Sequence, residues 1–105
     1  MKKSKDFNEY LIEKLHDPKK AVAYLNAVLE DCKDGSEESQ QLLLLAFKMV
    51  AQAQGGMSEV AKRADLGRES LYKTLSKRGN PKLSTLTALA KAMGFDFRFS
   101  LSSKK

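Results

Sequence analysis

Residues 57–76 read MSEVAKRADLGRESLYKTLS, and their apolar spacing predicts two short helices joined by a tight turn. The three residues Asp65-Leu66-Gly67 separate the two stretches and are too few to form anything but a turn. The small and apolar positions on the inward sides of the two stretches are Val60, Ala61, Ala64, Leu71 and Leu75. We therefore expect helices over about 57–64 and 68–76.

A helix-turn-helix unit makes the same demands, because its two short helices cross at a steep angle. The first helix needs a small residue at the crossing, and the turn needs a residue that tolerates positive φ. The second helix needs an inward apolar residue shortly after the turn. Ala61, Asp65 and Leu71 meet these needs. The pattern favours a DNA-binding helix-turn-helix over its alternative, a generic helical core with similar spacing.

Amphipathic patterns predict that most of the remaining chain is helical too, over about 6–15, 18–32, 37–54 and 83–93. Asp17-Pro18 is a strong start signal, since Asp caps free backbone N–H groups and Pro suits the first helical position. Gly94 can close the last helix in a left-handed conformation. The expected buried face of helix 18–32 consists of Val22, Leu25, Val28, Leu29 and Cys32.

The helix expected over 37–54 has two apolar stripes. One consists of Leu42, Leu45, Ala46, Met49, Val50 and Ala53, and the other of Leu43, Leu44 and Phe47. A helix that is apolar on two sides is normally covered on two sides. We therefore expect it to lie between the N-terminal helices and the helices that follow Gly55-Gly56.

The end of the chain has a different period, which predicts one half-buried β-strand. Its alternating apolar residues are Phe95, Phe97, Phe99 and Leu101. A single strand lacks a partner, so these residues are expected to pair with the same strand of a second copy in a homodimer. The alternative is a tail folded against its own helices. The predicted fold is all-α with this one strand, divided into an N-terminal arm (1–36), a helix-turn-helix domain (37–94) and a C-terminal strand and tail (95–105).

Charge is unevenly distributed along the 105 residues. The chain has 19 Lys and Arg against 13 Asp and Glu, a net charge of +6. Residues 1–56 carry 8 basic and 9 acidic residues, a net −1, whereas residues 57–105 carry 11 basic and 4 acidic residues, a net +7. A strongly basic second half suggests a polyanionic partner, although a solvated basic face without a partner has the same composition.

Composition excludes several classes of protein. The longest apolar run, residues 42–47, is far shorter than the roughly 20 residues that span a bilayer. Cys32 is the only cysteine and His16 the only histidine, which excludes an internal disulfide and a zinc site built from these two residue types. No Ser, Cys or His stands in a nucleophile arrangement. We expect a cytoplasmic protein without enzyme activity, metal or cofactor.

The candidate DNA surface is the outward side of helix 68–76 with the basic residues around it. Arg68 can reach a guanine edge in the major groove, or pair with a phosphate or with Glu69. Glu69 can accept from cytosine or orient Arg68, and Tyr72 can touch a thymine methyl or a phosphate, or cover the core. The basic residues and Ser58 are expected at phosphates. The full candidate set is Ser58, Gly67, Arg68, Glu69, Tyr72, Lys73, Lys77, Arg78 and Lys82.

From Gln52 onward the sequence resembles the lambda-repressor-like, or Cro/C1-type, DNA-binding domains. The whole chain further resembles the HigA-like addiction module antidote family, in pieces that follow the family's order. These pieces are residues 10–15 (YLIEKL), 17–18 (DP), 23–26 (AYLN), 55–57 (GGM), 68–72 (RESLY), 75–76 (LS), 79–81 (GNP) and 83–86 (LSTL). The chain departs from the family patterns at Asp65, where Gly is usual, at Gly67, where Ser is usual, and at Met57, where many such domains have Gln.

The resemblance implies an antitoxin of a type II toxin–antitoxin module. Such a protein neutralises a RelE/HigB-like toxin that cleaves mRNA, and it represses its own operon, so it associates with the bacterial nucleoid when bound to DNA. It also implies that the near-neutral N-terminal arm meets the toxin, which is basic because it binds RNA. The candidate toxin contacts are Phe7, Tyr10, Leu11, Tyr24 and Glu30.

Other interpretations of the same sequence stay open. The N-terminal helices can serve only to cover Leu43, Leu44 and Phe47. The protein can also be a stand-alone helix-turn-helix transcriptional regulator without a toxin, or an interaction module that does not bind DNA.

Overall fold

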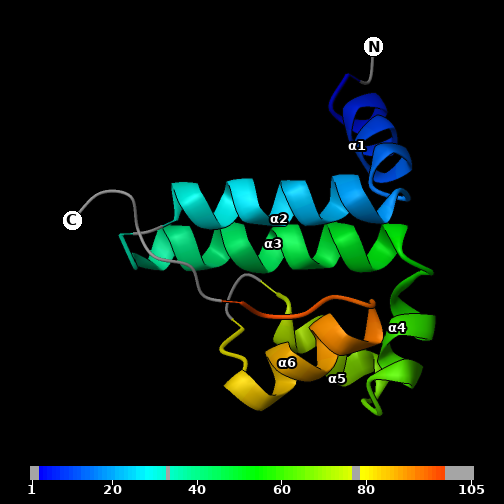
Figure 1. The fold of residues 1–105 in the computed structure, drawn as a ribbon, viewed down its shortest axis with the longest axis vertical. Helices are drawn as coiled ribbons and strands as arrows, with labels where there is room; N and C mark the ends of the chain where they lie inside the picture. Colours follow the sequence, from blue (N-terminus) through cyan, green and yellow to red (C-terminus); the bar gives the residue numbers. More distant parts are fainter. Residues whose placement is uncertain (1–2, 33, 77–78, 99–105) are drawn as a thin grey trace.

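The computed structural model describes residues 3–32, 34–76 and 79–98. Six helices make up this part of the chain (Figure 1). They are α1 (Lys3–Lys14), α2 (Pro18–Asp31), α3 (Glu37–Ala53), α4 (Met57–Arg63), α5 (Arg68–Thr74) and α6 (Leu83–Ala92). The helices predicted from periodicity are therefore confirmed. Five begin at the predicted residue, α1 begins three residues earlier, and the last residues differ by one or two.

Local capping explains where α2 and α3 begin. The Asp17 carboxylate accepts a hydrogen bond from the backbone N–H of Lys19 at 3.0 Å, and Pro18 is the first helical residue, as predicted. At α3, the Ser36 hydroxyl accepts from the Ser39 N–H at 3.1 Å. The Asp34 carboxylate accepts from the Ser36 N–H at 3.0 Å and from the Ser39 hydroxyl at 2.6 Å. These hydrogen bonds lower the pKa of Asp34, because they favour its ionised form.

Helix α3 lies at the centre of the fold. It runs alongside α2, α1 packs against it near the start of α2, and α4 to α6 lie on its other side (Figure 1). The prediction of a helix covered on two sides is confirmed. Its residues Val50 and Phe47 are buried, together with Leu15 before α2, Val60 of α4 and Leu89 of α6. One hydrophobic core thus joins α3 to the N-terminal layer, α1 and α2, and to the C-terminal layer, α4 to α6.

The side chain of Gln54 fastens the N-terminal layer to the end of α3. Its amide nitrogen Nε2 donates to the carbonyl oxygens of Leu15 at 2.7 Å and His16 at 3.2 Å. These two carbonyls follow the last turn of α1, where helical partners are missing. The turn between α1 and α2 is therefore held against α3 by hydrogen bonds as well as by the buried side chain of Leu15.

Parts of the predicted buried faces are exposed instead. Leu42 and Leu45 of α3 are 56% and 50% exposed, although Ala46 and Met49 of the same stripe are buried. Val22 and Leu29 of α2 are also exposed. The reason is geometric: the period places residues on one face of a helix, but no neighbouring helix of the described chain reaches these ends of the stripes.

The predicted C-terminal strand is wrong for the described residues. Residues 95–98 form no strand, because no second strand of the described chain lies beside them. Gly94 is left-handed (φ 83°) and closes α6, as expected, and the Phe95 N–H donates to the Ala90 carbonyl at 2.8 Å. Phe95 packs against the core and Phe97 is exposed, whereas Phe99 and Leu101 lie outside the described residues. The strand-paired dimer accordingly has no support here, and the described fold is all-helical.

None of the helices in the three described ranges is long and apolar enough to cross a membrane.

Candidate nucleic-acid interface

A four-residue turn, residues 64–67, sets the angle between α4 and α5. Asp65 adopts a left-handed conformation (φ 60°). Its N–H donates to the Lys62 carbonyl at 3.1 Å, and the N–H of Leu66 donates to the Ala61 carbonyl at 2.8 Å. These two hydrogen bonds close α4 in a Schellman motif, which normally has Gly at the left-handed position. The prediction that Asp65 takes a positive φ is therefore confirmed.

The inward positions of the two short helices are filled as the spacing predicts. Ala61 of α4 and Leu71 of α5 are buried, and so is Leu75 at the end of α5. Leu66 from the turn is partly buried and packs against the same core. Because Leu71 and Leu75 face the core, the opposite side of α5 faces solvent.

Two further contacts hold this pair of helices in the domain. Arg63 of α4 forms an ion pair with Glu59 at 3.3 Å, and its Nη1 donates to the Ala92 carbonyl at the end of α6 at 3.1 Å. After α5, the Gly79 carbonyl accepts a hydrogen bond from Gln40 Nε2 of α3 at 3.2 Å. A Cβ on Gly79 would overlap the carbonyl oxygen of Thr74, the last residue of α5. The backbone at Gly79 therefore lies too close to the end of α5 for a residue larger than glycine.

The outward side of α5 carries four of the predicted residues. Arg68, Glu69, Tyr72 and Lys73 are all exposed. The Arg68 guanidinium carbon lies 5.3 Å from the centroid of the Tyr72 ring, a cation–π distance. The Lys48 ammonium of α3 lies 5.7 Å from the same ring. Among the described residues, Arg68 contacts the Tyr72 ring and forms no ion pair with Glu69.

The structure brings most of the predicted DNA-facing residues together around two shallow hollows. Ser58, Gly67 and Arg68 line the first one, between α4 and α5. Glu69, Tyr72 and Lys73 line the second, along α5. Lys82 is exposed at the start of α6, while Lys77 and Arg78 lie outside the described residues.

Sequence reasoning missed three residues of this surface. Lys62 lines the first hollow and Ser70 the second, and Lys48 reaches Tyr72 from another helix. Lys62 carried a usable signal, since it is a basic residue on the outward side of the first short helix. Lys48 carried none, because only the packing of α3 beside α5 brings it near Tyr72.

The predicted toxin contacts do not form one surface. Phe7 and Tyr10 of α1 are exposed, and Leu11 is partly buried against the core. Tyr24 of α2 is partly buried as well, and this burial raises the pKa of its phenol above the usual 10.0. Glu30 is exposed near the far end of α2, whereas α1 lies beside its start (Figure 1).

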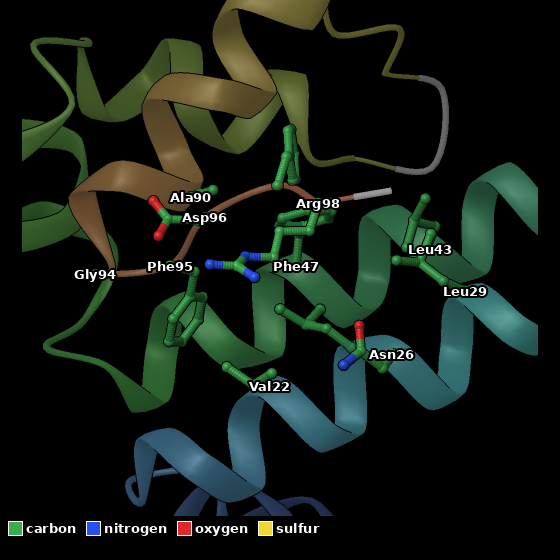
Figure 2. Close-up of a pocket in the computed structure, with 12 residues that line it drawn as sticks. Val22, Asn26, Leu29, Leu43, Phe47, Ala90, Gly94, Phe95, Asp96 and Arg98 are labelled. Atoms are coloured by element: carbon green, nitrogen blue, oxygen red, sulfur yellow. The ribbon is translucent and has the colours of Figure 1, made fainter. Parts of the chain in front are cut away.

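An apolar groove that sequence reasoning missed lies between α2, α3 and residues 95–98. The exposed side chains of Val22 and Leu29 line one wall, and Leu43 and Phe47 of α3 form the floor. Figure 2 shows Phe95 pointing from the C-terminal segment into this groove. The helical period predicts a buried face for Val22 and Leu29, so it gives no signal that these side chains line a groove.

Comparison with known proteins assigns the chain to a family. The family model described as "Probable addiction module antidote protein" matches residues 3–101. An uncharacterised protein of Haemophilus influenzae is 35% identical over 98 residues, which cover 93% of this chain and 92% of the relative. No solved structure gives a significant match. Since the family match extends over nearly all of the sequence, the chain belongs to the family of probable addiction module antidote proteins.

Proposed function

We propose that this antidote protein is the antitoxin of a type II toxin–antitoxin module that neutralises a RelE/HigB-like toxin and represses its own operon. In this proposal α4 and α5 are a lambda-repressor-like helix-turn-helix, and α5 enters the major groove of operator DNA. The observation that carries it is the orientation of α5. Leu71 and Leu75 are buried, so Arg68, Tyr72 and Lys73 face solvent.

The chemistry of this surface divides into readout and positioning. Arg68 has the planar fork of donors that matches a guanine edge. Lys73 and Lys82 are exposed and suit phosphate contacts, which supply affinity without sequence choice. Lys62 beside the first hollow has the same chemistry. The net +7 of residues 57–105 favours approach to DNA over the whole of this half.

Binding as a homodimer is part of the proposal. A recognition helix of seven residues reads only a few base pairs, and helix-turn-helix proteins gain length of readout by placing two copies on two half-sites. The dimer proposed here does not use the C-terminal strand, since residues 95–98 form none.

The toxin surface is proposed on the N-terminal layer. Residues 1–56 carry a net charge of −1, which suits a basic partner better than the second half does. Phe7 and Tyr10 are exposed aromatic side chains on α1, and aromatic residues are enriched where protein partners bind. These two residues are the best candidates among the predicted contacts.

The test separates the two activities with substitutions on opposite sides of the molecule. The DNA probe is the fragment directly upstream of the gene, and the protein probe is the neighbouring small basic protein, co-expressed. Arg68→Ala is expected to weaken operator binding by about 1–3 kcal/mol, a loss of roughly 5- to 150-fold, and to leave toxin capture unchanged. The double variant Phe7→Ser, Tyr10→Ser is expected to do the reverse.

Two results would contradict the proposal. Wild-type chain that binds the upstream fragment no better than random DNA contradicts autorepression. A neighbouring protein that the chain neither captures nor neutralises contradicts the RelE/HigB-like partner. Substitutions are preferable to removal of the arm, because Leu15 is buried in the shared core and its loss would disturb both activities.

A further inference from the structure

An exposed apolar patch lies on α3, next to the end of α5. Leu42 and Leu45 form its centre and are about half exposed. Together they form a small contiguous apolar surface on a helix whose Leu44 is buried. The residues that line the hollow around them are Glu38, Gln41 and Lys48 of α3, and Leu75 and Ser76 after α5.

The charges on this face of α3 are arranged symmetrically about the two leucines. Positions 38, 42, 45 and 48 recur at helical spacing, so they share one face. At 1.5 Å rise per residue, Glu38 lies about 8 Å before the midpoint of Leu42 and Leu45, and Lys48 about 7 Å after it. One end of the patch is therefore acidic and the other basic, at nearly equal distances from an apolar centre.

We propose that the patch binds a second copy of this chain, with the two α3 helices packed antiparallel across a two-fold axis between Leu42 and Leu45. An antiparallel pair brings Glu38 of each copy next to Lys48 of the other and joins the four leucines at the centre. Such self-complementarity is the defining property of an isologous interface. A uniformly basic partner would meet Lys48 with like charge, so the charge pattern favours the second copy.

This interface adjoins the DNA surface and shares one residue with it. Arg68, Glu69 and Lys73 lie outside the patch, whereas Lys48 lines it and its ammonium also lies 5.7 Å from the Tyr72 ring. The inference deepens the proposed function, since it names the surface through which the operator-binding dimer forms. The oligomeric state of the chain tests this inference, and it is measured in the absence of DNA.

The experiment is sedimentation equilibrium of the full chain over a range of concentrations. Wild type is expected to be a dimer, and Leu45→Glu is expected to raise the dimer dissociation constant at least about tenfold. Leu83→Glu is the matched control, because Leu83 is 73% exposed on α6 and lies outside the patch. Thermal melts followed by circular dichroism establish that each variant is folded.

Charge reversal distinguishes a second copy from any other occupant. Glu38→Lys and Lys48→Glu are each expected to weaken the dimer several-fold. Each single variant places two like charges opposite one another at both of the symmetry-related contacts between positions 38 and 48. The double variant Glu38→Lys, Lys48→Glu is expected to restore the dimer to within about twofold of wild type.

Several outcomes would overturn the inference. A monomeric wild type, a Leu45→Glu dimer as tight as wild type, or a double reversal no tighter than the weaker single variant each exclude this interface. A Leu45→Glu variant that stays dimeric but loses toxin capture assigns the patch to the toxin instead. Binding of the upstream DNA fragment is measured on wild type and Leu45→Glu. A monomer that still binds the fragment overturns the interface and the proposed homodimer but leaves DNA recognition by α5 standing. A dimer that fails to bind the fragment keeps the interface and contradicts the proposed autorepression.

Discussion

The Arg68 guanidinium carbon lies 5.3 Å from the centroid of the Tyr72 ring, one turn further along α5. Lys48 reaches the same ring from α3, at 5.7 Å. An aromatic ring attracts a cation near its face by about 0.5–1 kcal/mol at exposed sites. Tyr72 therefore restricts the positions open to Arg68 before DNA arrives, and such preorganisation favours a tight complex.

Replacement of the Tyr72 ring is expected to reduce operator affinity through Arg68. Tyr72→Leu removes the π system, and about a 2- to 5-fold loss follows from the cation–π free energy. Tyr72→Phe keeps the ring and is expected to bind within about twofold of wild type. Fluorescence anisotropy with the upstream fragment measures both variants, and NMR relaxation of the Arg68 Nε–H group in the free protein should show greater mobility in Tyr72→Leu alone. Equal losses in both variants would instead assign the effect to the Tyr72 hydroxyl.

Lys73 is expected to contact a phosphate, so its effect should be independent of sequence. Lys73→Ala should weaken binding to operator and to random DNA by similar factors, and should reduce the slope of log affinity against log salt by about 0.9. Lys20→Ala is the control, because Lys20 is an exposed residue of α2 on the other side of α3. A change in base preference without a change in slope would place Lys73 at a base edge.

The left-handed Asp65 is expected to make the turn sensitive to side-chain identity. Asp65→Ala should lower the free energy of unfolding by about 1 kcal/mol, since Ala adopts positive φ at greater strain than Asp. Asp65→Gly should raise it by up to about 1 kcal/mol, because Gly has no such strain. Urea denaturation measures both, and Asp96→Ala, which removes the same charge from residues 95–98, controls for net charge. Equal stabilities of the Ala and Gly variants would show that backbone strain is unimportant here.

Asp34 is expected to make the start of α3 sensitive to acid. Hydrogen bonds from Ser39 and Ser36 lower its pKa in the folded state below the usual 3.8. A lowered pKa contributes stability above the unfolded pKa, and this contribution is lost as the pH falls through the folded pKa. The melting temperature of wild type should therefore fall more than that of Asp34→Asn between about pH 5 and about pH 3. Parallel curves for the two proteins would rule out this linkage.

Local signals in the sequence predicted most of the helices and the turn. Asp17-Pro18 and Gly94 carry the physical chemistry of helix ends, and Asp65 is among the few residues that take positive φ at modest strain. The buried positions Ala61 and Leu71 follow directly from the crossing of two short helices. These features depend on residues close in sequence, which explains their predictability.

The features that could not be predicted depend on contacts between segments that are distant in the sequence. The alternation after Gly94 is genuine, but Phe95 is drawn into the core and its N–H completes the end of α6. The stripe on α3 predicted that Leu42 and Leu45 share a face with Met49, and it could not show that neighbouring helices stop short of them. The approach of Lys48 to Tyr72 likewise follows only from the packing of α3 beside α5.

The close approach of Gly79 to the end of α5 limits which residues the segment after α5 can accept. Only a hydrogen atom fits between this residue and the carbonyl of Thr74, while Gln40 holds the Gly79 carbonyl from α3. A larger residue at position 79 would therefore have to move away from that carbonyl and would disturb the hydrogen bond from Gln40. Under the proposed function, operator preference can therefore change through side chains at positions such as 68, 69 and 73, whereas position 79 has to remain glycine.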